Sequence, residues 1–288
     1  MIATVPAQNL RERALRSLSQ LPPFSPILNR LLASLAYEDV SFLKIAEIIE
    51  KDTVLAGNVL RLVNSALYGR RATVSSVRHA VSLLGMNKLR NATLGMSVTR
   101  LWNQVRTPPG WSMAKFNLHS VATGMLADML SQEALVDYPE GAFTAGLFHD
   151  LGRMLIAIGL PGEYEQVARL YLAGGGSRGE CETAILEFTS AELSAEALAQ
   201  WNLPQEIRTA VRYHNNPEMA PSSEGITLSR VIKAADGYVN AIGHQIDEGF
   251  PPPIDKAIVR LEELGLGRAL PSLLEAFAAE FEAVRALF

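Results

Sequence analysis

Apolar residues recur at helical spacing along the chain, and this periodicity limits the possible folds more than any other feature of the sequence. After Asp52, which suits a helix N-cap, an apolar stripe continues as far as Tyr68-Gly69, where the glycine suits a C-cap. The members of this stripe are Leu55, Val59, Leu62, Val63 and Ala66. The spacing predicts an amphipathic helix with one face turned to the core.

Two more stripes repeat the pattern. One follows Ser41, and the other runs from Ser75 or Ser76 to Gly85. Their apolar members are Phe42, Ile45, Ile48 and Ile49 in the first, and Val77, Ala80, Val81 and Leu84 in the second. No sustained run of alternating β-branched residues bounded by turn signals is present, so the sequence predicts no strand. We therefore expect an all-α fold.

Breaks in the helical pattern divide the chain. The segment VRTPPGW at 105–111 predicts a boundary between an N-terminal lobe, 1–108, and a second lobe, 109–248. After the Phe250–Pro253 run, two C-terminal helices within 249–288 are expected to pack on the module. The glycine run at 174–179 has two interpretations, a phosphate-binding loop or a plain helix connection, and it lacks the Lys-Ser/Thr of a P-loop.

Composition excludes several classes of protein. The chain has 288 residues, of which 48% are hydrophobic, so a sizeable core is available without cross-links. The single cysteine, Cys181, excludes a disulfide framework and a multi-cysteine zinc site. No apolar run resembles a signal-peptide core or a membrane span, which predicts a cytoplasmic protein with no membrane partner.

Charge is divided unevenly along the chain. Residues 1–110 carry a net charge of +8, whereas 111–288 carry −12. No acidic residue lies between Asp52 and Asp128, an interval with nine basic residues that include Arg70, Arg71 and Arg78. This basic region could dock on the acidic half of its own chain, or these arginines could bind an anionic partner in trans. The pattern does not favour sequence-specific DNA binding, because no helix-turn-helix or zinc-finger signature accompanies it.

Candidate chemistry is concentrated in a few histidines and aspartates. His149 and Asp150 are adjacent in the apolar segment AFTAGLFHDLGRMLIAIGL, which predicts a buried helix. A buried imidazole and carboxylate need partners, and a divalent metal ion would satisfy both, although the two could simply hydrogen-bond to each other. His119 and Asp236, in other predicted helices, could supply further ligands.

Together, His119, His149-Asp150 and Asp236 resemble the H…HD…D pattern of the HD superfamily of metal-dependent phosphohydrolases. Several longer segments are similar to the HDOD family, the signalling relatives of the HD and HD-GYP hydrolases. They are LPPFSPILNRLL, VLAGNVLRLVNSALYG, SSVRHAVSLLG, AFTAGLFHDLGRM and QWNLPQEIRTAVRYH, within residues 16–240. This resemblance implies an N-terminal helical bundle before an HD-like bundle, in a bacterial signal-transduction protein whose partner is a signalling protein or nucleotide in trans.

The chain departs from the hydrolase pattern in three places. Ser190 and Asn215 stand where HD-GYP relatives carry histidines, and Arg153 stands where they usually carry lysine. A two-metal centre is therefore not expected. A single site of His119, His149, Asp150 and Asp236 would suit Mn, Fe, Co, Ni or Zn. His214 is expected at a helix end, where an imidazolium would suit the dipole, with lining of the pocket as the alternative.

Two functions follow from the resemblance. The first is a regulatory HDOD module that binds a signalling partner and holds one metal ion for structure or sensing. The second is a mononuclear phosphohydrolase of a nucleotide or phosphate ester, in which Arg153 would stabilise developing charge. An enzyme needs an open cleft, whereas side chains such as Phe148 or Met154 could fill the pocket of a scaffold. Asn64 is expected to bridge helices, and His79 and His244 are interpreted as ordinary helix residues.

Overall fold

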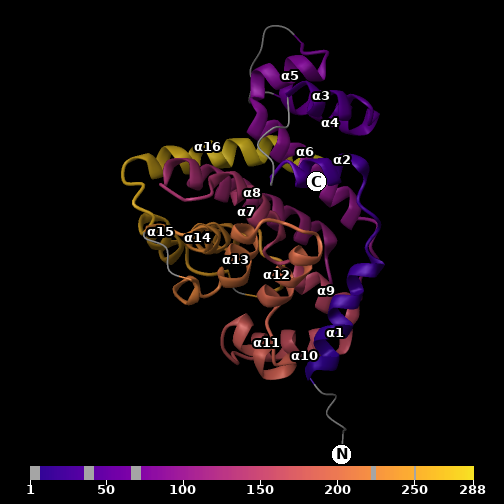
Figure 1. Cartoon of the computed structure of the whole chain (residues 1–288). Helices are drawn as coiled ribbons and strands as arrows, with labels where there is room; N and C mark the ends of the chain where they lie inside the picture. The colour runs from indigo at the N-terminus through magenta and orange to yellow at the C-terminus, as the bar shows by residue number, and fades with distance from the viewer. Residues whose placement is uncertain (1–6, 36–41, 66–72, 222–224, 250) are drawn as a thin grey trace, which may run out of the picture.

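A computed structural model describes residues 7–35, 42–65, 73–221, 225–249 and 251–288. Every regular element in these ranges is a helix, so the prediction of an all-α fold is confirmed. Figure 1 shows an elongated molecule, with α3, α4 and α5 at one end and α1, α10 and α11 at the other. The long helix α7 (Met113–Glu133) and the short helix α8 (Ala142–Phe148) lie between the two ends.

The N-terminal part of the chain forms a small bundle of helices. Its members are α2 (Pro26–Ala33), α3 (Phe42–Glu50), α4 (Thr53–Val63), α5 (Val77–Leu84) and α6 (Met86–Trp102). The predicted caps form: the Asp52 carboxylate accepts hydrogen bonds from Val54 N and Leu55 N, and the Ser76 hydroxyl accepts one from His79 N. Gly85, with φ 76°, ends α5 as predicted.

Asn64 joins the end of α4 to the chain that leads into α5. Its side chain donates to the carbonyl of Val74 at 2.9 Å and accepts from Val74 N at 2.8 Å, so it bridges two segments as the sequence predicted. Helix α4 ends at Val63, and the predicted end at Gly69 lies outside the described residues.

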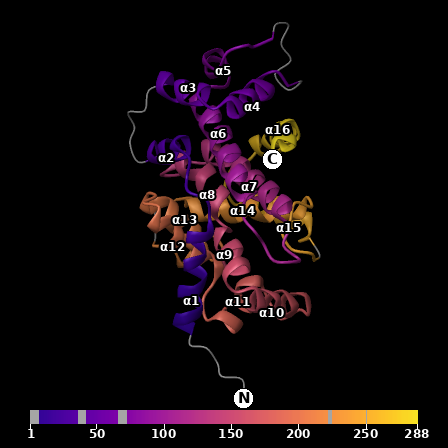
Figure 2. The same cartoon turned by 90° about the vertical axis from the view of Figure 1, so that its right-hand side faces the viewer.

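A second, larger bundle surrounds α7. Its inner helices are α7 (Met113–Glu133), α8 (Ala142–Phe148), α9 (Leu151–Gly159), α12 (Ser190–Gln200), α13 (Gln205–Tyr213) and α14 (Leu228–Ala241). The helices around them are α1 (Ala7–Arg16), α10 (Pro161–Leu172), α11 (Arg178–Leu186), α15 (Ile254–Glu262) and α16 (Ala269–Val284). Helix α16 packs on α7, and α1 packs on α9 and α12, away from α3–α5 (Figure 2). The lobe boundaries predicted at 108 and 248 stay predictions.

Two glycines allow α7 and α8 to cross closely. A Cβ atom at Gly146 would lie 2.7 Å from the Cα of Gly124, and one at Gly124 would lie 2.8 Å from the carbonyl oxygen of Phe143. Real Cβ atoms do not approach other atoms this closely, so both positions require glycine. This crossing brings His119 on α7 near the end of α8, where His149 follows.

Aromatic side chains join the N-terminal bundle to the second one. Trp102, at the end of α6, packs against Phe116 on α7 and Phe148 on α8, with ring centroids 4.9 and 5.9 Å apart. Phe148 also contacts Trp201, which in turn contacts Phe24. These contacts fasten the chain immediately before His149, since Phe148 and Trp102 are almost fully buried.

Among the described residues, no single helix combines the length and the apolar composition needed to cross a membrane. One run, Pro139–Leu172, meets the criterion by length and composition, and only as two helices bent by 120° against each other.

Candidate metal centre

His149 and Asp150 lie in a break between α8 and α9. The prediction of one continuous helix is therefore wrong at this point, because Asp150 leaves the helical backbone with φ −102° and ψ 13°. The Oγ atom of Ser194 on α12 bridges the break: it accepts a hydrogen bond from Gly152 N at 2.7 Å and lies 2.8 Å from the carbonyl oxygen of His149. Adjacent residues of an unbroken helix point about 100° apart, so the break helps both side chains reach one centre.

Helix α9 can reach Ser194 because Gly152 has no side chain. A Cβ atom at Gly152 would lie 2.0 Å from the carbonyl oxygen of Ser190 and 2.9 Å from Ser194 N, both backbone atoms of α12. The contact between α9 and α12 therefore requires glycine here, and it sets the position of the chain just after the His149-Asp150 pair.

Four side chains from three parts of the fold converge on one point. The Nε2 atoms of His119 and His149 are 3.2 Å apart. Asp150 Oδ2 lies 3.7 and 3.6 Å from these two nitrogens, and Asp236 Oδ1 lies 3.3 and 3.6 Å from them. His119, His149 and Asp150 each offer one ligand atom within a group spanning 4.8 Å. The four residues that the sequence suggested as ligands are thus brought together.

Backbone carbonyls set the tautomers of both imidazoles. His119 Nδ1 donates to the carbonyl of His244 at 2.8 Å, and His149 Nδ1 donates to the carbonyl of Gly146 at 2.7 Å. A carbonyl can only accept, so both Nδ1 atoms carry protons and both neutral rings turn an Nε2 lone pair to the same point. Two lone pairs and two carboxylate oxygens then face one another without a donor. A metal ion between them would satisfy all four, whereas a proton on one Nε2 atom would supply a donor to the carboxylates alone.

The pKa shifts of three of these residues show that the cluster favours positive charge on the His149 imidazole and negative charge on the carboxylates. Although burial acts to lower it, the pKa of His149 is raised to about 9 by the carboxylates of Asp150 and Asp236. Burial acts to raise the pKa of Asp150, but Arg153 and the two imidazoles outweigh it and hold that pKa well below the ordinary value. The pKa of Asp236 is likewise held low, because His119 and His149 outweigh its burial.

The donor set fits a divalent transition metal. Metal–ligand bonds to imidazole and carboxylate are about 2.0–2.2 Å long, so ligands of one ion lie about 3–4 Å apart, as these atoms do. Two imidazoles with two carboxylates suit Mn, Fe, Co, Ni or Zn. The outer hydrogen bonds that orient ligands in metal sites are also present: the carbonyls of His244 and Gly146 hold the imidazoles, and Asn240 donates to Asp236 Oδ1 at 2.7 Å.

A cavity of about 320 Å³ opens beside the four residues, and both Asp150 and Asp236 line it. His214 also lines it, at the C-terminal end of α13, with its ring 5.0 Å from that of His149. His214 thus lies at a helix end as predicted, while burial and the neighbouring His149 lower its pKa, which disfavours the imidazolium expected there. Phe148 and Met154 are buried in the core and do not line this cavity.

Arginines on the wall of the cavity are already paired with carboxylates. Arg153 Nη1 donates to Asp150 Oδ2 at 2.7 Å, and its Nη2 donates to Asp247 Oδ2 at 2.5 Å. Arg178 on α11 also donates to Asp247 Oδ2, while Tyr164 donates to the other oxygen at 3.1 Å. One carboxylate thus takes the place between two arginines where an anionic ligand would bind.

Ser190, where the resemblance implies a missing histidine, binds a buried carboxylate instead. Its backbone nitrogen and hydroxyl both donate to Glu182 Oε2, at 2.7 and 2.9 Å, and Arg178 lies 3.5 Å from the other oxygen. Burial raises the pKa of Glu182. Asn215 lines the same cavity. The positions of both absent histidines are therefore occupied by other polar groups.

The arginines suggested for an anionic partner are only partly within the described structure. Arg70 and Arg71 lie outside the described residues. Arg78, with 58% of its side chain exposed, lies 3.9 Å from both Glu47 and Glu50 of α3. These are long, exposed pairs that leave the guanidinium accessible.

Sequence reasoning missed the segment 242–249 that follows α14. The prediction that His244 lies on a helix is wrong, because α14 ends before it. In this segment the carbonyl of His244 accepts a hydrogen bond from His119, and its ring packs on Phe281 of α16. Asp247 in the same segment pairs with Arg153 and Arg178. No motif marks these residues, because their roles depend on the segment after α14 lying beside α7 and α9 in the folded chain.

Comparison with known proteins identifies the fold. The family profile described as HDOD domain matches residues 21–217. An HDOD domain protein of unknown function from Geobacter sulfurreducens is 22% identical and superposes with a TM-score of 0.77. The match covers 98% of this chain and 99% of that protein. A candidate phosphohydrolase from Shewanella amazonensis is 24% identical, with coverages of 96% and 97% and a TM-score of 0.71.

Two more matches are partial. A candidate signal transduction protein from Marinobacter aquaeolei is 20% identical over all of this chain and 67% of its own length, with a TM-score of 0.71. An uncharacterized protein of Treponema pallidum is 23% identical over 219 residues, which is 75% of this chain, and this chain spans 42% of that relative's length. At these identities the solved structures establish the fold and nothing finer.

Proposed function

The chain belongs to the HDOD family, and on this premise we propose that it is a signal-transduction module that holds one divalent transition-metal ion. The ligands would be His119, His149, Asp150 and Asp236. The observation that carries the proposal is the convergence of two imidazole Nε2 atoms and two carboxylate oxygens on one point, with both Nδ1 atoms held by backbone carbonyls. When bound, the ion would neutralise the carboxylates and polarise an oxygen atom of a ligand in the adjoining cavity.

A regulatory role is favoured over catalysis by the groups around the four residues. Ser190 and Glu182 occupy the region where a second metal ion would need a histidine, so the residues for a two-metal clamp are missing. Arg153 and Arg178 are engaged by Asp247, and a phosphate group would have to displace that carboxylate. These features suit a site that senses or stabilises and whose partner, a signalling protein or a nucleotide, binds in trans.

Metal analysis tests the proposal. We expect about one metal ion per chain in protein purified without chelators or nickel resin, measured by inductively coupled plasma mass spectrometry. The double variant His149→Ala, Asp150→Ala is expected to contain none. His79 is exposed on α5, so His79→Ala is the matched control and should retain the metal. Absence of metal from the folded native chain, even after addition of Mn²⁺ or Fe²⁺, would leave the four residues as a packed hydrogen-bonded cluster and contradict the proposal.

A mononuclear phosphohydrolase is the second candidate, and one observation favours it. The cavity beside the four residues holds about 320 Å³, and Asp236, with 23% of its side chain exposed, lies at its wall. A ligand could therefore reach the centre from this side. Release of p-nitrophenol from bis(p-nitrophenyl) phosphate in the presence of Mn²⁺ would support this candidate if the double variant lost it. No release above the variant's background would leave the regulatory function.

Removal of the Asp247 carboxylate should expose the anion-binding capacity of the arginine pair. We expect Asp247→Asn to bind inorganic phosphate roughly ten times more tightly than the native chain in calorimetric titration, because the substitution removes the negative charge that both guanidinium groups share while preserving side-chain shape. Glu248 is the neighbouring carboxylate and is 90% exposed, so Glu248→Gln is the control and should change little. Equal phosphate affinity in both variants would mean that the arginines serve the fold alone.

A further inference from the structure

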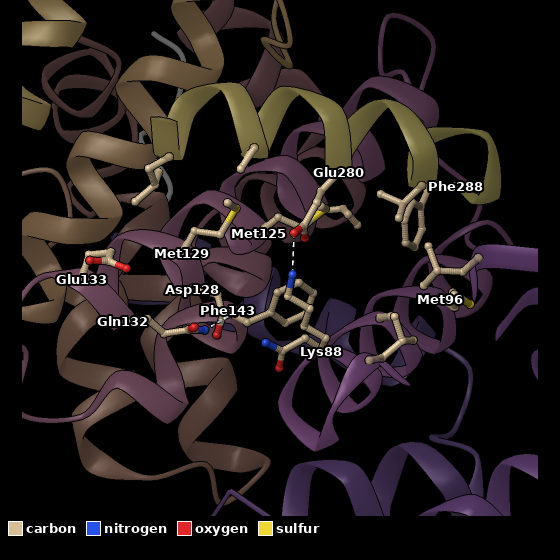
Figure 3. Close-up of a pocket in the computed structure, with 18 of the residues that line it drawn as sticks. Lys88, Met96, Met125, Asp128, Met129, Gln132, Glu133, Phe143, Glu280 and Phe288 are labelled. Carbon is tan, nitrogen blue, oxygen red and sulfur yellow. Dashed lines mark hydrogen bonds and ion pairs between the residues drawn. The ribbon is translucent and has the colours of Figure 1, made fainter. Parts of the chain in front are cut away.

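The described structure contains a second cavity, on the opposite side of α7 from the four histidine and aspartate residues. It holds about 380 Å³, within the usual range of small-molecule sites, and lies between α6, α7 and α16. Figure 3 shows its position under α16, with Met125, Met129 and Asp128 contributed by α7 and Lys88 by α6. Nothing in the proposed metal function uses this cavity.

The walls of the cavity are mostly apolar and adaptable. Met96, Met125 and Met129 line it together with Phe143 and Phe288. Methionine side chains are unbranched and polarisable, so they can rearrange around an inserted apolar group and make favourable contacts with an aromatic ring. The walls therefore suit the apolar body of a ligand, and an aromatic body in particular.

One end of the cavity carries polar groups that the protein does not satisfy. Asn91 on α6 is 5% exposed and its side-chain oxygen has no hydrogen-bond partner, while its amide group acts on the neighbouring Asp128 carboxylate and lowers the pKa of that group. Asp128, 9% exposed, receives one hydrogen bond from Gln132 at 2.9 Å. A buried amide oxygen without a partner destabilises the folded chain, so a ligand with a polar head would supply the hydrogen bond that this oxygen lacks.

Charge around the cavity selects the sign of that head. Three carboxylates line it, Asp128, Glu133 and Glu280, against the single ammonium group of Lys88. Lys88 is already paired with Glu280 at 2.5 Å, as the dashed line in Figure 3 marks. Arg90 lies behind the wall and donates to the carbonyl of Glu140 instead of entering the cavity. Arg90 acts on Asp128 from behind the wall, but among the groups that line the cavity carboxylates outnumber cations by three to one, which favours a cationic ligand.

We propose that this cavity binds a small amine, with an apolar, preferably aromatic, body against the methionines and an ammonium head between Asp128 and Asn91. The ammonium would donate to the Asp128 carboxylate and to the Asn91 amide oxygen, which satisfies both groups. Because Asp128 has a pKa of about 6 in the folded chain, its carboxylate is ionised at neutral pH and available to the ammonium group.

Three probes with the same indole body test the choice of head. Calorimetric titration of the full chain is expected to detect tryptamine with a dissociation constant of roughly 0.1–1 mM, while 3-ethylindole binds more weakly and indole-3-propionate does not bind. Asp128→Asn should weaken tryptamine at least about tenfold, because it removes a charge-assisted hydrogen bond. Equal binding of the cationic and anionic probes, or no binding of tryptamine at about 10 mM, would overturn the proposal.

A second pair of variants tests the location. Ala276 lines the cavity from the exposed side of α16, so Ala276→Trp should block it and abolish tryptamine binding without loss of the fold. Ala278 is exposed on the same helix and does not line the cavity, so Ala278→Trp should bind normally. Undiminished binding by Ala276→Trp would place the ligand elsewhere. Self-association of the chain that Ala276→Trp abolishes would assign the cavity to a second copy and overturn the amine site.

Discussion

Substitution of Gly152 by alanine is expected to destabilise the protein by about 3 kcal/mol or more, which lowers the melting temperature by roughly 6–10 °C. The new Cβ would lie 2.0 Å from the carbonyl oxygen of Ser190, and this atom belongs to the backbone of α12, so no rotamer change can relieve the contact. Helix α9 must move away from α12. That movement would also break the hydrogen bond from Gly152 N to Ser194 Oγ, which bridges the chain at His149.

The matched substitution is Gly57→Ala in the middle of α4. Gly57 is exposed, and a Cβ atom there would meet nothing within 4 Å. Alanine is preferred over glycine inside a helix, so this variant should gain about 0.5–1 kcal/mol. Thermal unfolding of both variants by circular dichroism therefore separates the contact from helix propensity. A melting temperature of Gly152→Ala equal to that of the native chain would show that α9 and α12 are not held as closely as described.

Local signals account for the part of the fold that the sequence predicted. Asp52, Ser76 and Gly85 act within one helical turn of themselves, so their roles as caps can be recognised without knowledge of the tertiary structure. The apolar stripes between these caps are buried as predicted; for example, Leu55 and Val59 are at most 4% exposed. An apolar stripe is buried by whichever helices pack against it, so its burial can be predicted before those helices are known.

The break at His149-Asp150 could not be predicted in this way. The segment around it is apolar on every side, which favours a continuous buried helix, and the departure depends on Ser194, 45 residues later in the chain. The close approach at Gly152 likewise depends on the position of α12. Tertiary contacts overrode the local preference at the His149-Asp150 break and at Gly152, and both places lie at or beside the candidate site.

The candidate ligands were suggested by a resemblance, whereas their surroundings had no sequence signal. The H…HD…D pattern brought His119, His149, Asp150 and Asp236 together before any geometry was known. Asp247 and Arg178 belong to no motif, and the role of His244 rests on its backbone carbonyl, which any residue could provide. Physical reasoning from spacing can propose ligands, but the partners that orient or block them require the fold.

The charge division along the chain is partly used inside the molecule. Lys88 pairs with Glu280, and Lys115 lies 3.9 Å from Glu248, so two basic residues of the 53–127 region meet acidic residues of the C-terminal part. Arg100 instead pairs with Asp52, which also caps α4. Internal docking thus accounts for part of the basic region, and an anionic partner for Arg78 stays a prediction.

Asp128 is expected to make the stability of the chain depend on pH. Burial raises its pKa from the ordinary value of 3.8 to about 6, although Asn91, Arg90 and Lys88 act in the opposite direction. The folded state therefore holds this proton more tightly than the unfolded state. Its contribution is most favourable below about pH 4 and is lost as the pH rises to about 6, above which the ionised carboxylate stays buried at a cost of about 3 kcal/mol.

Replacement of Asp128 by asparagine removes that cost, so the free energy of unfolding at about pH 7.5 should rise by about 2–3 kcal/mol, while the gain near pH 4 should be close to zero. Urea unfolding at both pH values measures the difference. Glu133→Gln, on the exposed side of the same helix, controls for the loss of one negative charge and should show no such contrast. Asp128→Asn should also bind tryptamine more weakly, because the carboxylate that costs stability is the group that binds the amine. A destabilised Asp128→Asn at neutral pH would instead mean that attraction to Arg90 and Lys88 outweighs the burial of the charge.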